Sequence, residues 1–257
     1  MDLHLKGKCA VVTGGTRGIG RAIADLLADE GAKVAICARK PDEVEAAAAA
    51  LAAKGVKAWG AAVDVSDGAA LKGFVTQAGE RLGGIDVLVS NVSAAPMGND
   101  DAAWKAMLDV DVLGATRSFE AALPFLEKAA AAKGDAAFVI ISSISAAEAR
   151  DGPTAYGAMK AALIHYAKGV ARAHAAKPIR ANVISPGTVY FDDGFWGRVK
   201  SQAPAMFEAV MGRNPTGRMA TPEEIAAAAV FLASPRSGFT TGTNLVVDGA
   251  ISTRANF

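Results

Sequence analysis

The sequence predicts a doubly wound α/β fold in which helices cover both faces of a seven-stranded parallel sheet. Short apolar segments alternate along the chain with longer segments of helical periodicity. The apolar segments show no alternation of polar and apolar residues, which is typical of parallel strands buried on both faces. Right-handed crossovers between such strands favour the doubly wound arrangement. The predicted strands are residues 9–12, 34–37, 58–63, 87–89, 138–141, 181–184 and 245–247.

The segments between these strands have the periodicity of helices, and one of them carries a complete start signal. Thr221 is placed as an N-cap, Pro222 as the first helical residue and Glu224 as the partner in a capping box. No repeat or linker divides the chain, so we expect a single domain over residues 1–257. The predicted helices are residues 18–30, 41–54, 69–81, 100–133, 154–175 and 222–232.

The composition excludes several classes of protein. Hydrophobic residues make up 51% of the chain, and a formal net charge of +1 gives no basic surface for nucleic acid. The sequence shows no signal peptide and no apolar run of the length that crosses a bilayer. Cys9 and Cys37 fall on predicted strands, where we expect core residues rather than a disulfide or a metal site. We therefore expect a cytoplasmic protein that binds no metal, membrane or nucleic acid.

Three glycines mark the turn between the first predicted strand and the first predicted helix. Gly14, Gly18 and Gly20 leave no side chain between the backbone and a ligand at this turn. The helix that follows presents free amide groups and a partial positive charge, which together bind phosphate. A strand, a glycine turn and a helix predict a dinucleotide-binding site.

Small or polar residues end each of the first six predicted strands. Turns favour such residues, but all six lie at the carboxyl edge of the sheet, where ligands of this fold bind. The fifth strand ends at Ser143, and Tyr156 and Lys160 share a face of the following helix. A lysine one turn from a tyrosine favours the phenolate and lowers the tyrosine pKa, which suits proton transfer. We interpret this edge as a reactive cleft.

Together these motifs resemble the short-chain dehydrogenase/reductase family over essentially the whole chain. The resemblance rests on Thr-Gly-x-x-x-Gly-Ile-Gly at 13–20, Asp64-Val65, Ser143 with Tyr156 and Lys160, and Asn-Val-Ile-Ser-Pro-Gly at 182–187. The C-terminal segments 214–218, 231–234, 241–242 and 248–249 also match. The resemblance implies a Rossmann fold, a nicotinamide cofactor, and hydride exchange with a carbonyl or an alcohol.

The resemblance also implies a role for each matching residue. Tyr156 is the expected general acid and base, Ser143 orients the carbonyl, and Lys160 lowers the tyrosine pKa and binds ribose. Asp64 and Val65 border the adenine, and Asn91 lies along its ribose. The expected cofactor-binding residues are Gly14, Thr16, Arg17, Gly18, Ile19, Gly20, Arg39, Asp64, Val65, Asn91, Ser93, Tyr156, Lys160, Pro186, Gly187 and Val189.

Charged residues near the end of the second predicted strand indicate which nicotinamide cofactor the protein prefers. Family members that prefer NAD carry an acidic residue at the end of the second strand, where this chain has Ala38. Arg39 follows it and Arg17 lies in the glycine loop, so both are placed to bind a 2′-phosphate. Either arginine alone is an ordinary surface residue, but with the acid absent we expect NADP(H) in preference to NAD(H).

The chain departs from the family pattern at three positions. Ser93 replaces a glycine after the fourth strand, and Phe191 replaces a threonine that contacts the nicotinamide. Asp111 replaces the asparagine of the catalytic tetrad, and its charge would pair with Lys160. We hypothesise that Asp111 keeps a working proton relay with an altered pH optimum.

Residues 188–214 form the expected substrate lid, in which a helix around 197–211 would bury several apolar side chains. The aromatic content of the lid favours a bulky, hydrophobic or aromatic carbonyl substrate. Tyr190, Phe191 and Trp196 are its expected substrate contacts, with Ser145 on the other side of the cleft. The other wall is expected to include Glu148, Arg150 and residues 94–99.

The sequence therefore predicts an NADPH-dependent reductase that is reversible as an alcohol dehydrogenase. Two alternatives stay open: a nucleotide-binding sensor or scaffold that has lost catalysis, and an NAD-linked alcohol dehydrogenase. The resemblance further implies a homotetramer, or a homodimer, with the predicted helices 100–133 and 154–175 at one interface.

Overall fold

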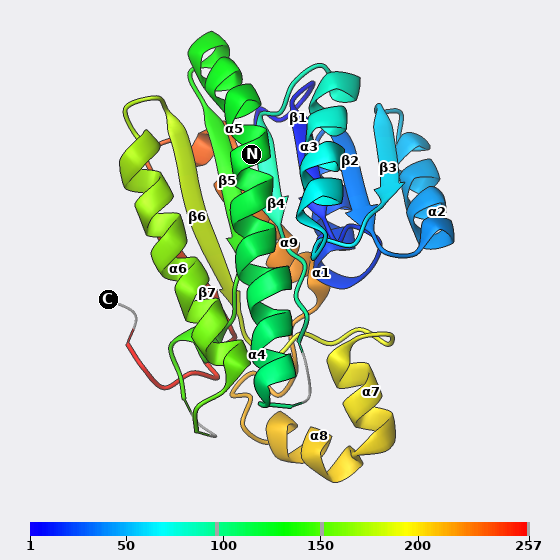
Figure 1. The fold of residues 1–257 in the computed structure, drawn as a ribbon. Coiled ribbons are helices and arrows are strands. Elements are labelled where there is room, and N and C mark those ends of the chain that lie inside the picture. The colour runs from blue at the N-terminus through cyan, green and yellow to red at the C-terminus, as the bar shows by residue number, and fades with distance from the viewer. Residues whose placement is uncertain (96–97, 150–151, 256–257) are drawn as a thin grey trace.

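Seven parallel strands form the centre of the computed structural model, which describes residues 1–95, 98–149 and 152–255 (Figure 1). The strand order is β3-β2-β1-β4-β5-β6-β7, and every pairing is parallel. The predicted doubly wound fold is therefore confirmed. The strands are β1 (Cys9–Thr13), β2 (Lys33–Ala38), β3 (Ala58–Ala62), β4 (Val87–Ser90), β5 (Ala136–Ile141), β6 (Ile179–Pro186) and β7 (Asn244–Val247).

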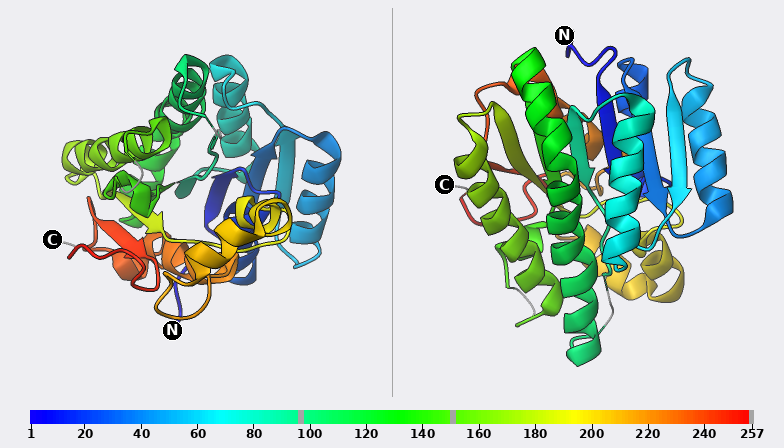
Figure 2. Two further views of the ribbon diagram at one scale, coloured as in Figure 1. Left: turned by 90° about the horizontal axis from the view of Figure 1, so that it is seen from below. Right: turned by 45° about the horizontal axis from the view of Figure 1, so that its top comes forward.

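Helices cover both faces of this sheet and create two hydrophobic cores (Figures 1 and 2). One core lies under α3, α5 and α6, and the other lies under α1, α2 and α9. The helices are α1 (Gly18–Asp29), α2 (Pro41–Ala52), α3 (Gly68–Leu82), α4 (Asp101–Met107), α5 (Leu113–Lys133), α6 (Ala155–His174), α7 (Phe195–Gln202), α8 (Pro204–Met211) and α9 (Pro222–Ala233), with short helical turns at η1 (Leu108–Val112), η2 (Ile144–Ala146) and η3 (Pro235–Ser237).

The two edge strands differ from the prediction that all strands are buried. Every residue of β1, β4, β5 and β6 is buried, whereas β3 and β7 contain only half-buried or exposed residues. An edge strand has one neighbouring strand, and in this fold the helices cover it less completely. An apolar sequence thus marked these segments as strands without showing that they lie at the edges.

The predicted continuous helix over residues 100–133 is interrupted. Residues 108–112 form a π-helical turn, η1, between α4 and α5. A π turn inserts one residue into a helix and rotates the side chains that follow. Here the turn contains Asp111, which is buried with 2% of its surface exposed.

The predicted helix around 197–211 is in fact two helices, α7 and α8, and Pro204 explains the break. Proline disfavours helical backbone at the residue before it, and Ala203 has φ −143° and ψ 63°. Pro204 then occupies the first turn of α8, where its missing amide hydrogen costs nothing.

The strand order reverses between β1 and β4, so the crevice between their carboxyl ends is the expected ligand site. In Figure 1 this edge faces downwards, and α7 and α8 lie beyond it. In the described part of the chain, we find no helix whose length and apolarity would let it span a membrane.

Candidate functional site

The glycine loop is fixed to the ends of its two neighbouring strands. The amides of Gly14 and Gly15 donate to the Cys37 carbonyl oxygen at the end of β2, at 2.8 and 3.3 Å. The Asn91 side-chain amide after β4 donates to the carbonyl oxygens of Thr13 and Gly14, both at 3.2 Å. Asn91, which is expected along a ribose, thus also holds the turn in shape.

The first turn of α1 forms a cradle that excludes side chains. A Cβ on Gly20 would lie 2.2 Å from the Gly14 carbonyl oxygen and 2.3 Å from the Asn91 amide nitrogen, so only glycine fits. Gly14 and Gly18 have φ of +69° and +54°, which glycine adopts without strain. The N-cap residue, Arg17, provides no side-chain cap, and the first turn contains no acid. An anionic group fits this cradle because the helix amides and dipole attract it.

A rim of charge surrounds the adenosine end of the expected cofactor site. Arg17 and Arg39 are exposed, as is Lys40, whose ammonium lies 2.6 Å from a Glu43 carboxylate oxygen. This ion pair holds the pKa of Glu43 below its usual value. Asp64 after β3 accepts hydrogen bonds from the amide and the hydroxyl of Ser66, at 2.9 and 2.7 Å, and these lower its pKa. Both carboxylates are therefore negative at neutral pH, and each lies near cationic side chains of this rim.

A buried ion pair lies beneath Tyr156. The Lys160 Nζ on α6 is 2.9 Å from the Asp111 Oδ1, and the two side chains are 2% and 0% exposed. Lys160 also donates to the Ile141 carbonyl oxygen at 3.1 Å, and its Nζ lies 5.7 Å from the centre of the Tyr156 ring. The other Asp111 oxygen accepts from the Ala94 amide at 2.9 Å. The pairing of Asp111 with Lys160 follows the charge argument made from the sequence, and it links η1, α6 and the segment after β4.

One hydrogen bond joins α6 to the residue after β5, and a second shapes the turn that follows β5. The Ser142 hydroxyl donates to the Lys160 carbonyl oxygen at 2.9 Å, and Ser143 Oγ accepts from the Ser145 amide at 3.1 Å. Gly157, next to Tyr156, allows a close approach, because a Cβ there would lie 2.8 Å from the Ser145 carbonyl oxygen. The structure thus brings Ser143, Ser145, Tyr156 and Lys160 to one edge of the sheet.

Asn99, the last residue of the segment 94–99 expected on the wall of the cleft, also positions α6. Its side-chain oxygen accepts from the Ala155 amide and its nitrogen donates to the Pro153 carbonyl oxygen, both at 2.8 Å. These bonds connect the segment before α4 to the N-terminus of α6, whose own cap is Thr154. A local sequence pattern shows only that an asparagine precedes a helix, not which helix it binds.

The remaining expected cofactor residues lie along the same edge. Val65 and Val189 are buried, and the amide of Gly187 donates to the Val247 carbonyl oxygen at 3.0 Å. The Ser93 hydroxyl is buried and has no hydrogen-bond partner among the residues that the structure describes. A ligand group at this edge would find in it an unused donor and acceptor. Thr16, Ile19 and Pro186 occupy the glycine loop, the first turn of α1 and the last residue of β6.

The lid side chains expected to contact the substrate pack mostly against other residues of the protein. The Tyr190 hydroxyl donates to Asp192 at 3.0 Å and its ring packs edge-on against Phe207 at 6.0 Å. Trp196 packs against Phe195 at 5.1 Å, and the Phe191 ring lies against Gly18 and Gly194. On the opposite wall, Glu148 accepts from the Thr253 amide at 3.0 Å. Arg150, Pro96 and Met97, expected on that wall, lie outside the described residues.

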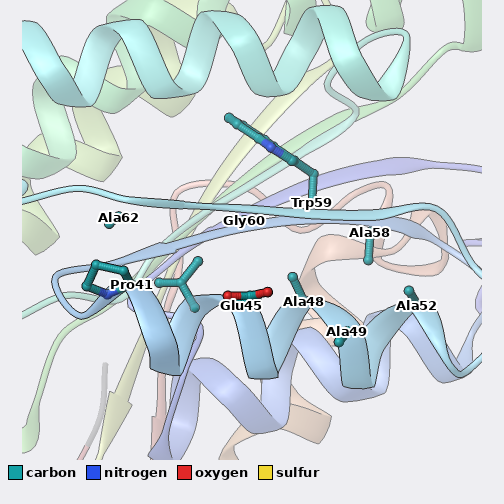
Figure 3. Close-up of a pocket in the computed structure, with 10 residues that line it drawn as sticks. Pro41, Glu45, Ala48, Ala49, Ala52, Ala58, Trp59, Gly60 and Ala62 are labelled. Carbon is teal, nitrogen blue, oxygen red and sulfur yellow. The ribbon is translucent and has the colours of Figure 1, made fainter.

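A groove of about 480 Å³ lies elsewhere, between α2 and β3 (Figure 3). Alanine side chains dominate its lining, and Trp59 leaves β3 on the side away from α2, where it stacks on Phe74 of α3. Glu45 is the one charged residue in the described lining of this groove. With no converging polar groups, the groove lacks the features of a reactive site. Among the residues that the structure describes, no three His, Cys, Asp or Glu side chains are grouped to hold a metal ion.

Comparison with known proteins identifies the family. Residues 14–252 match a family model described as enoyl-(acyl carrier protein) reductase. The chain is 35% identical to isoepoxydon dehydrogenase of Penicillium expansum over 98% of each protein. The chain belongs to the short-chain dehydrogenase/reductase family.

Solved structures of this family support the same conclusion. L-sorbose reductase of Gluconobacter frateurii, complexed with NADPH and L-sorbose, has a TM-score of 0.88 and 30% identity, covering 99% of this chain and 100% of the reductase. A short-chain dehydrogenase of Burkholderia cenocepacia in complex with NADP has a TM-score of 0.84 and 31% identity, covering 96% and 98% of the two chains. These short-chain dehydrogenase/reductase relatives place the chain among oxidoreductases.

Proposed function

We propose that the protein is an NADPH-dependent carbonyl reductase that also runs in reverse as an alcohol dehydrogenase. The observation that carries this proposal is that one edge of the sheet holds both an anion cradle, at Gly14–Gly20, and the Tyr156–Lys160 pair with Ser143. A reduced nicotinamide, when bound, supplies a hydride to the carbonyl carbon of a substrate. The relatives named above support a nicotinamide cofactor, because two of them were solved with NADPH or NADP.

In this proposal Tyr156 and Ser143 act on the carbonyl oxygen. The Tyr156 hydroxyl gives its proton to the oxygen as negative charge develops there. Ser143 Oγ accepts from the Ser145 amide, so its own hydrogen is left to donate to the same oxygen. In the reverse direction, the tyrosine takes the proton of the alcohol.

In this proposal Lys160 provides a positive charge close to Tyr156 and helps to bind the cofactor. The Lys160 ammonium has three N–H donors, of which one forms a hydrogen bond with the Ile141 carbonyl oxygen. The Asp111 Oδ1 lies 2.9 Å from Nζ as an ion-pair partner without hydrogen-bond geometry. A donor is therefore left for a ribose hydroxyl of the cofactor.

Three groups of residues would hold the rest of the cofactor. The diphosphate would be held by Gly14, Thr16, Gly18, Ile19 and Gly20. The adenosine would be bordered by Asp64, Val65, Asn91 and Ser93, and the nicotinamide by Pro186, Gly187 and Val189.

Charge at the adenosine end favours NADPH. Arg17 and Arg39 are exposed beside the cradle, and β2 ends at Ala38, which has no charge to repel a 2′-phosphate. Glu43 opposes them, but it is paired with Lys40. Guanidinium groups form stronger charge-assisted hydrogen bonds with a phosphate than with a hydroxyl, so a 2′-phosphate gains more at this rim.

We further propose a lid over residues 188–214 and a bulky, hydrophobic or aromatic carbonyl substrate. Phe195 and Met206 on the two lid helices are 36% and 48% exposed, so the lid offers apolar surface in spite of its internal packing. Isoepoxydon dehydrogenase is one relative of this chain, and a cyclohexanecarboxylate derivative is the substrate named for another. Six-membered cyclic ketones therefore belong in the first substrate panel.

The experiment that tests this function follows NADPH and NADH oxidation with aromatic, steroidal, aliphatic and cyclic ketones, for the wild type and Tyr156→Phe. We expect NADPH-linked turnover of at least one bulky ketone by the wild type and a loss of about 10²–10⁴-fold in the variant. NADPH binding without turnover on any ketone or alcohol would instead support the sensor. Tighter binding of NADH would support the NAD-linked dehydrogenase.

A further inference from the structure

The side chain of Phe191 lies against the first residue of α1. A Cβ on Gly18 would be 2.5 Å from the Phe191 Cζ and 2.8 Å from its Cε1, so the tip of the ring lies within one side chain's reach of Gly18. The same ring lies against Gly194, where a Cβ would be 2.7 Å from Cε1. The ring is therefore held between the phosphate cradle and the start of α7.

The backbone on both sides of Phe191 fixes this position. The Tyr190 amide donates to the Ala220 carbonyl oxygen, and the Ala220 amide donates to that of Thr188, both at 2.9 Å. After the ring, the Gly194 amide donates to the Phe191 carbonyl oxygen at 3.0 Å. The bridge and the turn leave the side chain little choice of direction other than toward Gly18.

A bound phosphate group and this ring compete for the same space at the first turn of α1. The first turn of α1 has no side-chain cap and no acid, so its amides are available to a bound anion. An anion must come within hydrogen-bond distance of those amides, and on its way to Gly18, the first residue of this turn, it meets the Phe191 ring. An apolar ring satisfies none of these donors.

We propose that Phe191 is a built-in competitor of the cofactor diphosphate: its ring lies against Gly18 at the start of the cradle, and the dinucleotide binds only when the ring leaves. This inference rests on the proposed function, because it needs a dinucleotide at the glycine loop. Displacement of the ring releases its contact with Gly194 at the start of α7.

The affinity for the cofactor measures this competition. When only a fraction of the molecules has an open site, the apparent Kd is the Kd of the open form divided by that fraction. An open fraction of about one tenth, typical of a minor conformer, weakens binding about tenfold. Phe191→Ala removes the ring, so the apparent Kd for the cofactor should fall by about the same factor of ten.

The experiment titrates NADPH into the wild type, Phe191→Ala and the matched control Phe195→Ala by calorimetry. Phe195→Ala makes the same change on the same lid at a ring that packs on Trp196 instead. We expect Phe191→Ala to bind NADPH about tenfold more tightly than the wild type. The control Phe195→Ala should bind NADPH with the wild-type affinity. Adenosine 2′-monophosphate, which has no diphosphate, should bind the wild type and Phe191→Ala equally. Phe191→Leu, which keeps an apolar side chain, gives a smaller gain and replaces the alanine variant if that one does not fold.

The outcomes separate this inference from the proposed function. Wild-type binding of NADPH together with equal or weaker binding in both Phe191 variants would overturn the inference and leave the reductase intact, because the ring would then be a neutral neighbour or a supporting contact. Absence of NADPH binding in the wild type and in both variants would overturn the proposed cofactor and the inference together.

Discussion

Lys160 and Asp111 form an ion pair that has almost no contact with solvent, at 2% and 0% exposure of their side chains. Burying two opposite charges is expensive unless both are well hydrogen-bonded, and here Ile141 and Ala94 supply the further bonds. The Asp111 carboxylate opposes part of the positive charge that Lys160 presents to the Tyr156 hydroxyl. At the scale of the residue, Asp111 is a positioning residue that adjusts the electrostatics of its neighbour.

Asp111→Asn should move the pH dependence of alcohol oxidation. Asparagine keeps an acceptor for Lys160 but removes the negative charge, so the full lysine charge acts on the reacting oxygens and the acid limb of the kcat/KM profile moves to lower pH. The matched control is Asp109→Asn, in the same turn, where the carboxylate pairs with Lys105 at the surface and is 27% exposed. A profile that stays in place in a folded Asp111→Asn variant would contradict the proposed electrostatic effect.

The start of α9 shows how one short element is stabilised by its own residues. The Thr221 hydroxyl accepts from the Glu224 amide, and the Glu224 carboxylate accepts from the Thr221 amide at 2.9 Å, which forms a capping box. Arg218 reaches the same carboxylate from outside the helix, with an N–O distance of 2.7 Å. The Arg218 hydrogen bond and the Thr221 amide lower the pKa of Glu224 to about 2.

This cap should stabilise the protein in a pH-dependent way. The folded-state pKa of Glu224 is depressed from its usual value of 4.5, so its contribution is fully present above that value and is lost as the pH falls toward about 2. Glu224→Gln should therefore unfold at lower urea than the wild type at pH 6, and the difference should shrink below pH 4.5. Glu223→Gln in the same turn is the control, and an equal pH-dependent loss there would contradict the assignment to the capping box.

Across the whole molecule, Arg180 connects elements that are far apart in the sequence. The side chain is 4% exposed, and its guanidinium binds Asp135 before β5 through two oxygens, at 2.7 and 3.2 Å. It also donates to the carbonyl oxygens of Leu232 and Ser234 at the end of α9, at 2.6 and 3.0 Å. One residue of β6 thus holds α9 against the sheet at the edge opposite the candidate site.

Arg180→Met should destabilise the whole fold without touching the site. It leaves a carboxylate and several buried acceptors unpaired, which costs about 3–5 kcal/mol and lowers Tm by about 6–20 °C for a chain of this size. Arg172→Met at the exposed end of α6 is the matched control. Adding Asp135→Leu should recover part of the loss, because no charge is then left alone. A Tm within 2 °C of the wild type would contradict the contribution assigned to Arg180.

The fold could be predicted from the sequence because its signals are local and repeated. Apolar runs show the strands, and capping residues such as Thr221 show where a helix begins. Pro204 was a visible break signal within the lid segment, and the prediction of one helix across it was wrong. The exposure of β3 and β7 depends on strand order, which apolar runs alone do not show.

The candidate site could be predicted only as far as its motifs extend. Tyr156 and Lys160 lie four residues apart and share a helix face, so their proximity follows from the helix itself. Asn99 binds a helix whose start is more than fifty residues away, and Phe191 reaches a glycine at the other end of the sequence. Such long-range contacts are set by the path of the chain in three dimensions, which a motif does not show.

The π turn at Leu108–Val112 sets the helical phase of everything that follows it. One additional residue advances the phase by about 100°, so the stripe of α4 that meets α6 and the stripe of α5 that meets the sheet need not lie on one line. The turn allows α4 to face α6 while α5 faces the sheet, which one uninterrupted helix could not do. A deletion of one residue within it would restore a regular helix and would bring only one of these two surfaces into register, at the expense of the other.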